Sequence, residues 1–106
     1  MIDRPMKSQW YQILLALAGQ RLHGFGIQRA VLDATDGHMT LWPAMLYRSL
    51  ATLEEEGMIE QVPTPDGEPE DERRQYYALT ASGHERLREE TDMLARWVRA
   101  ANRAVT

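Results

Sequence analysis

Two groups of side chains in this sequence have the chemistry to bind an anionic polymer. One group surrounds Arg48 and includes a threonine one helical turn later, Thr52. The other is the adjacent pair Arg73 and Arg74, which follows three acidic residues. Arginine forms paired hydrogen bonds with phosphate oxygens and with the edge of guanine. Both groups therefore favour a nucleic-acid surface, provided that the fold presents them on the same side.

The segment that carries Arg48 is predicted to be a helix. Pro43 suits the first turn of a helix, where its missing N–H costs nothing, and Gly57 suits the position just beyond the end. The i, i+4, i+7 spacing predicts a buried stripe of Leu46, Leu50 and Leu53. The side chains left outside that stripe are those of Ala44, Met45, Tyr47, Arg48, Ala51, Thr52 and Glu55.

Periodicity and turn residues predict the other elements. The expected order is a helix from about Ser8 to Ala18, a helix from near Gly24 to before Gly37, a short extended piece over Met39–Leu41, the helix that begins at Pro43, a strand over Met58–Val62, a proline-rich loop, a strand over Gln75–Leu79, and a last helix from Thr80 to about Ala104. A helix followed by two strands around a charged loop is typical of a recognition helix and its β-wing. The expected fold is mainly α with a small β-wing: a winged helix-turn-helix of residues 1–80 and an added long C-terminal helix of residues 81–106.

The formal charge of −4 opposes DNA binding unless the acids lie away from the phosphates. In a docked helix-turn-helix the N-terminal half of the recognition helix meets the bases, and that half contains no acid, because residues 54–56 lie in the last turn. The candidate DNA-binding residues are Ala44, Met45, Tyr47, Arg48, Thr52, Arg73, Arg74 and Lys7. Simpler alternatives stay open: Tyr47 as a core residue, one wing arginine neutralised by its acidic neighbours, and Arg48 as an ordinary surface residue.

The last helix carries an apolar seam with an average spacing of 3.5 residues, formed by Leu87, Thr91, Leu94, Val98, Ala101 and Val105. Met93 and Trp97 widen this apolar surface beyond what packing against a single body requires. We therefore expect a homodimer with an interface that includes Leu87, Leu94, Trp97, Val98 and Ala101. The alternative is a helix that folds wholly onto its own domain.

Three ordered motifs carry a family resemblance: YQILLALA with HGFGI, then LYRSLATLEEEGMI, then DERRQYYALTASGHERL. Together they resemble the short branch of the PadR family of bacterial transcriptional regulators. The resemblance implies a dimeric winged helix, repression of a nearby promoter and release from DNA by a small effector. Family members commonly have Pro-Gly-Thr before LYR, whereas this chain has Pro43-Ala44-Met45. Met45 replaces a hydroxyl that could bond a phosphate or a base, so the resemblance does not supply the operator sequence.

An effector is the least direct of these expectations. Some short PadR-like proteins hold flat aromatic or cationic compounds between subunits, where tryptophan faces stack. The residues that would supply such a surface here are Trp97, Met93 and Trp10.

Other classes of function have little support. The chain has no cysteine, no nucleophile elbow and no glycine-rich phosphate loop, and its three histidines are widely separated, so we expect no enzyme, cofactor or metal. No signal peptide or membrane span is recognisable, which predicts a cytoplasmic protein. The main rival is a dimeric winged helix that binds another protein instead of specific DNA. Arg48, Thr52 and the wing arginines favour DNA, whereas Met45 slightly favours the rival.

Overall fold

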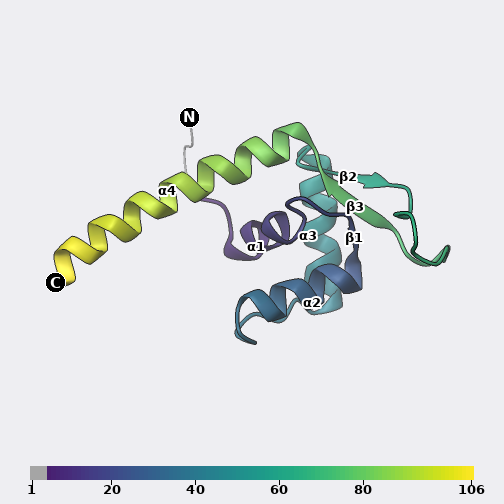
Figure 1. The fold of residues 1–106 in the computed structure, drawn as a ribbon, viewed down its shortest axis with the longest axis horizontal. Helices are drawn as coiled ribbons and strands as arrows, with labels where there is room; N and C mark the ends of the chain where they lie inside the picture. The colour runs from purple at the N-terminus through teal and green to yellow at the C-terminus, as the bar shows by residue number, and fades with distance from the viewer. Residues whose placement is uncertain (1–4) are drawn as a thin grey trace.

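The computed structural model describes residues 5–106 as a cluster of three helices, a small sheet and one projecting helix (Figure 1). The elements in chain order are α1 (Ser8–Ala16), β1 (Leu22–His23), α2 (Gly24–Ala34), α3 (Pro43–Glu55), β2 (Ile59–Val62), β3 (Tyr76–Leu79) and α4 (Ala81–Val105). This is the expected winged helix-turn-helix with an added C-terminal helix, and each predicted helix lies within about two residues of its expected bounds.

The three strands form an antiparallel sheet in the order β1-β3-β2, with Leu22 opposite Tyr77 and Ile59 opposite Leu79. Beyond the paired residues, β2 and β3 continue into the long loop that projects at the right of Figure 1, and this loop is the wing.

One predicted element is wrong. The extended piece over Met39–Leu41, expected to form a short strand between the second and third helices, is not a strand, and the third strand is formed instead by Leu22 and His23, before α2. The backbone between α2 and α3 is bonded to side chains: Gln28 Nε2 donates to the carbonyl of Leu41 at 2.7 Å, and the N–H of Met39 donates to Thr35 Oγ1 at 3.0 Å. With these groups satisfied locally, the segment gains little from pairing with a sheet.

The core lies where α1, α2 and α3 meet the sheet. Its buried side chains are those of Ile13, Leu14, Leu17, Ile27, Val31, Leu41, Leu46, Leu50, Leu53, Ile59, Tyr77 and Leu87. All three leucines of the predicted stripe on α3 are in this set, which confirms the rotation of α3 about its axis. Ser49 is also buried on the same side of α3, a position that the leucine spacing did not reveal.

The first half of α4 is held firmly by its own chain. Thr80 caps it by accepting a hydrogen bond from the N–H of Gly83 at 2.9 Å, and also donates to the carbonyl of Gly57 at 2.6 Å. Further along, the buried carboxylate of Glu90 lies 2.8 Å from the guanidinium of Arg86 and accepts from the N–H of Met6. These contacts tie α4 to the turn between α3 and β2 and to the segment that leads into α1.

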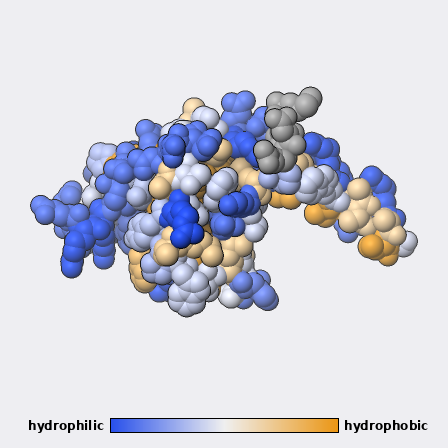
Figure 2. All heavy atoms as spheres, turned by 180° about the vertical axis from the view of Figure 1, so that it is seen from behind, coloured by the Kyte–Doolittle hydropathy of each residue, from blue (hydrophilic) through white to orange (hydrophobic). Residues whose placement is uncertain are grey.

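The second half of α4 extends away from the rest of the chain (Figure 1). Apolar side chains are visible along its free end, whereas the wing at the opposite end is hydrophilic (Figure 2). None of the helices within residues 5–106 has the length and hydrophobicity needed to cross a bilayer.

We expect Gly83→Ala to destabilise the fold strongly. Helix propensity alone favours alanine over glycine by about 1 kcal/mol, but a Cβ on Gly83 would collide with the backbone carbonyl of Met58, which no rotamer change can move away. Overpacking of this kind costs about 1–3 kcal/mol or more. Thermal and urea unfolding measure the loss, with the exposed neighbour Ser82→Ala as control. An unchanged or higher stability for Gly83→Ala would show that α4 does not pack so closely on Met58, the residue that precedes β2.

Candidate nucleic-acid interface

The N-terminal half of α3 presents a long exposed face, because its buried stripe lies on the opposite side. Ala44 and Arg48 are exposed one turn apart, and Met45 and Tyr47 flank them with 37% and 56% of their surfaces accessible. The acidic residues of α3 lie in its last turn, as predicted. We call the residues Ala44, Met45, Tyr47 and Arg48 the exposed face of α3.

Tyr47 leans from α3 across the first turn of α2. Its hydroxyl would lie only 2.7 Å from a Cβ built on Gly24, so a larger residue there would have to push the tyrosine ring aside. With half of its surface accessible and its hydroxyl at the start of α2, Tyr47 is not a core residue. Burial raises the pKa of the neighbouring Tyr77 phenol, with smaller contributions from Glu54 and Tyr47, so that phenol stays neutral at physiological pH.

The start of α3 is rigid in its backbone but open to solvent in its side chains. Leu41 is fully buried, and its carbonyl is held by Gln28, which fixes the residue that follows, Trp42. Trp42 is the N-cap residue and makes no side-chain cap, so it leaves the first N–H groups of α3 without a side-chain acceptor. The indole ring of Trp42 is 66% exposed, and the sequence analysis did not identify it as a candidate.

The start of α1 borders the other edge of the exposed face. Lys7 Nζ lies 5.1 Å from the centre of the Trp10 ring, and both residues line a small groove of about 100 Å³ with Met45 and Arg48. Thr52 lines the same groove, but its hydroxyl donates to the carbonyl of Arg48 in its own helix. The structure therefore brings Lys7 to the exposed face, and leaves Thr52 able to accept but not to donate.

The two arginines of the wing are not equivalent. Arg73 donates from Nε to Asp71 Oδ1 at 3.2 Å, whereas Arg74 lies 3.9 Å from the other oxygen of Asp71. The hydrogen bond from Arg73 holds the pKa of Asp71 below its usual value and raises the pKa of Arg73. Asp71 therefore stays ionised and engages Arg73 more closely, which leaves Arg74 the better candidate for a phosphate contact.

A depression of about 250 Å³ brings part of α2, α3 and the wing together. It is lined by His23, Gly24, Phe25, Tyr47, Arg73, Arg74 and Gln75. His23 caps α2 by accepting from the N–H of Gly26, and its ring stacks on Phe25 with 6.4 Å between ring centres. Phe25 and His23 therefore join the candidate interface residues, although the sequence alone did not indicate them. The HGFGI motif indicated only a helix start, whereas it also places an exposed aromatic ring beside the wing.

The residues proposed for dimerisation and effector binding divide into two groups. Leu87 and Met93 are buried within their own chain. Trp97, Val98 and Ala101 are exposed on the projecting half of α4, and Leu94 lies between these two environments. Trp10 lies in the groove beside α3 instead of on the projecting half of α4. Within one chain, therefore, the three effector candidates lie in different surroundings: Met93 is buried, Trp97 is exposed, and Trp10 lines the groove beside α3.

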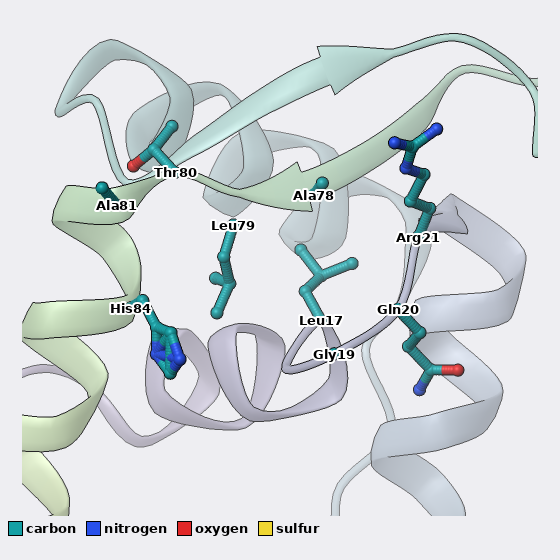
Figure 3. A pocket seen from close by; sticks show the side chains of 9 residues that line it. All are labelled: Leu17, Gly19, Gln20, Arg21, Ala78, Leu79, Thr80, Ala81 and His84. Carbon is teal, nitrogen blue, oxygen red and sulfur yellow. The ribbon is translucent and has the colours of Figure 1, made fainter.

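A larger cleft of about 420 Å³ lies between the α1–β1 turn, β3 and the start of α4 (Figure 3). Its floor contains Leu17 and Leu79, with Arg21 and His84 on opposite sides (Figure 3). Because these two basic side chains do not converge, the cleft does not present a single charged site. It shares no residue with the exposed face of α3.

Residues 13–89 match the Transcriptional regulator PadR-like family. A transcriptional regulator from Clostridium thermocellum superimposes with a TM-score of 0.75 at 21% identity, over 95% of this chain and 99% of that one. A PadR family transcription regulator from Clostridium difficile gives 0.75 at 17% identity, over 94% and 100%. Bacillus subtilis PadR in complex with operator DNA gives 0.64 at 25% identity, over 78% of this chain and 46% of that one. No curated protein sequence matches the chain.

Proposed function

Because the chain belongs to the PadR-like family of transcriptional regulators, we propose that it binds specific operator DNA as a homodimer in the cytoplasm and represses transcription. The observation that carries this proposal is the exposed face of α3, which offers an arginine and no acid in the half of the helix that enters the major groove. The similar fold of a PadR in complex with operator DNA supports it.

The roles of the residues follow from their positions. Arg48 would read a base edge, since it lies on the exposed face between the groove beside Lys7 and the depression beside Arg74, while Tyr47, Arg74 and Lys7 would bind phosphates. The rival function, docking of another protein, gains from the exposed rings of Phe25 and Trp42. It does not account for three cationic side chains around one acid-free helix face, so DNA is the better assignment.

Dimerisation would use the projecting half of α4. Val98, with 58% of its surface accessible, and Trp97 with 52%, belong to an apolar strip that its own chain does not cover. Burial of such a strip is favourable at about 25 cal/mol per Å² of apolar surface. We propose that residues 1–80 form the DNA-binding unit and that 81–106 serve dimerisation, with Leu87 and Met93 fixing α4 to its own domain.

We further propose that a flat aromatic effector binds between the subunits beside Trp97 and weakens DNA binding. A second subunit could enclose Trp97, which is 52% exposed within one chain. A ligand there releases DNA only if it favours a spacing of the two α3 helices that misses the half-sites.

We expect Arg48→Ala to weaken binding to a selected operator by about 1–3 kcal/mol and to relax the sequence preference at one position. The operator, obtained by selection from random duplexes, should be roughly palindromic with half-sites about 34 Å or a multiple apart. Arg74→Ala should weaken all sequences alike and reduce the salt slope by about one. Binding titrations at several salt concentrations measure both effects.

Arg73→Ala is the matched control for the wing, because the close pairing of Arg73 with Asp71 should make its loss less costly than that of Arg74. If Arg48→Ala retains the full affinity and preference of the wild type, α3 is not the recognition helix.

The proposed dimer should show a thermal stability that rises with protein concentration. Val98→Asp should yield a folded monomer, because Val98 is exposed within its own chain and a charge there is desolvated only when two chains meet. Sedimentation measures the mass, and circular dichroism checks the fold. Arg96→Asp, a larger charge change on the polar side of α4, should leave the dimer intact. A wild type that is monomeric at high concentration would refute the proposal.

Flat aromatic compounds and phenolic acids should quench tryptophan fluorescence and lower DNA affinity by about 5–150-fold at saturation. Trp97→Phe should remove most of the quenching while Trp10 and Trp42 still emit. Quenching with unchanged DNA affinity would mean that a pocket exists without a switch.

A further inference from the structure

The first turn of α3 has an unusual exposed surface for a helix that enters DNA. Its three exposed side chains ahead of Tyr47, apart from Pro43, are those of Trp42, Ala44 and Met45. Between them they carry one conventional hydrogen-bonding group, the indole N–H. Base reading by hydrogen bonds from Asn, Gln, Ser or Thr is therefore absent from this turn.

The backbone beneath these side chains is held in place. Leu41 is fully buried and its carbonyl accepts from Gln28, while the stripe of Leu46 and Leu50 fixes the rotation of the helix. A large ring that is 66% exposed on a fixed backbone loses little backbone freedom when it meets a partner. Met45 lines a groove together with Arg48, and Ala44 is exposed one turn before Arg48, so whatever Arg48 reads lies close to these two side chains.

In the major groove one base carries an apolar group, the C5-methyl of thymine. Resting on the proposed DNA binding, we propose that Trp42, Ala44 and Met45 read the methyl groups of thymines in each half-site. Arg48 lies four residues after Ala44, about 6 Å along the helix, and base pairs are about 3.4 Å apart. The guanine read by Arg48 then lies within about two base pairs of these thymines.

Replacement of thymine by deoxyuridine tests this proposal, because it removes the methyl and keeps every hydrogen-bonding group. The probe is the duplex selected from a random library by the wild-type protein. Each thymine is replaced singly, and affinity is measured at fixed salt. We expect about a fourfold loss per contacted methyl at one or two positions of each half-site, and none outside the half-sites.

Two variants assign the contact to residues. Trp42→Ala and Met45→Gln should each abolish the deoxyuridine effect at one position while Arg48 still discriminates guanine. Phe25→Ala, which removes an exposed ring that lines the neighbouring depression on α2, should keep the deoxyuridine effect whatever it does to the overall affinity. Circular dichroism checks that each variant folds, and Met45→Gln serves if Trp42→Ala does not.

The outcomes separate the two proposals. Specific binding that is indifferent to deoxyuridine at every position overturns methyl reading but leaves the DNA-binding function intact. The apolar first turn of α3 would then be better explained as a surface that binds another protein. Loss of the effect in Phe25→Ala alone would move the contact to α2 and also overturn the inference. Absence of any selected duplex would overturn the proposed function itself.

Discussion

The burial of one leucine stripe on α3 controls the rest of this structure. Leu46, Leu50 and Leu53 are at most 3% exposed, so the helix cannot rotate about its axis without exposing them. Full burial of each such side chain is worth about 1.5–3 kcal/mol, which makes any other rotation costly. Everything that α3 presents to solvent, including Arg48, is thereby determined by residues that never meet a partner.

The same leucine stripe determines which charged side chains of α3 face solvent, and this explains how a chain of net negative charge can bind DNA. The glutamates of α3 lie in its last turn, and five acids of the wing loop outnumber its two arginines. Phosphate binding is therefore unfavourable near the wing tip, and Asp71 already engages Arg73. Three cations lie on or beside the half of α3 that has no acid: Lys7, Arg48 and Arg74. The local distribution of charge, not its sum, decides where a polyanion approaches.

Helices were predictable because the apolar period of 3.6 residues persists over three turns, and the wing strands because prolines and glycines separate them. The strand of Leu22 and His23 could not be predicted, because two residues are too few to show an alternating pattern. It forms because one edge of β3 is free to pair with it. Exposed Trp42 was missed for a related reason. Its exposure depends on the burial of Leu41 and on the bond from Gln28, both set by packing between α2 and α3.

The apolar seam of α4 shows that residue spacing predicts which side of a helix is apolar, but not whether that side packs on its own chain or is left exposed. Its repeat continues unbroken, yet Leu87 packs in its own core while Val98 is exposed. The buried part of the seam is the part of α4 that is bonded to α1 and to the residues before it. There the hydroxyls of Tyr11 and Thr91 share a hydrogen bond, and the N–H of Met6 donates to Glu90. Because the opening turn of α1 also borders Arg48 through Lys7, one short helix touches both the anchored half of α4 and the exposed face of α3. The start of α4 also reaches the end of α3 directly, because Thr80 donates to the carbonyl of Gly57. Contacts at both ends of the anchored half of α4 therefore hold it in place relative to α3.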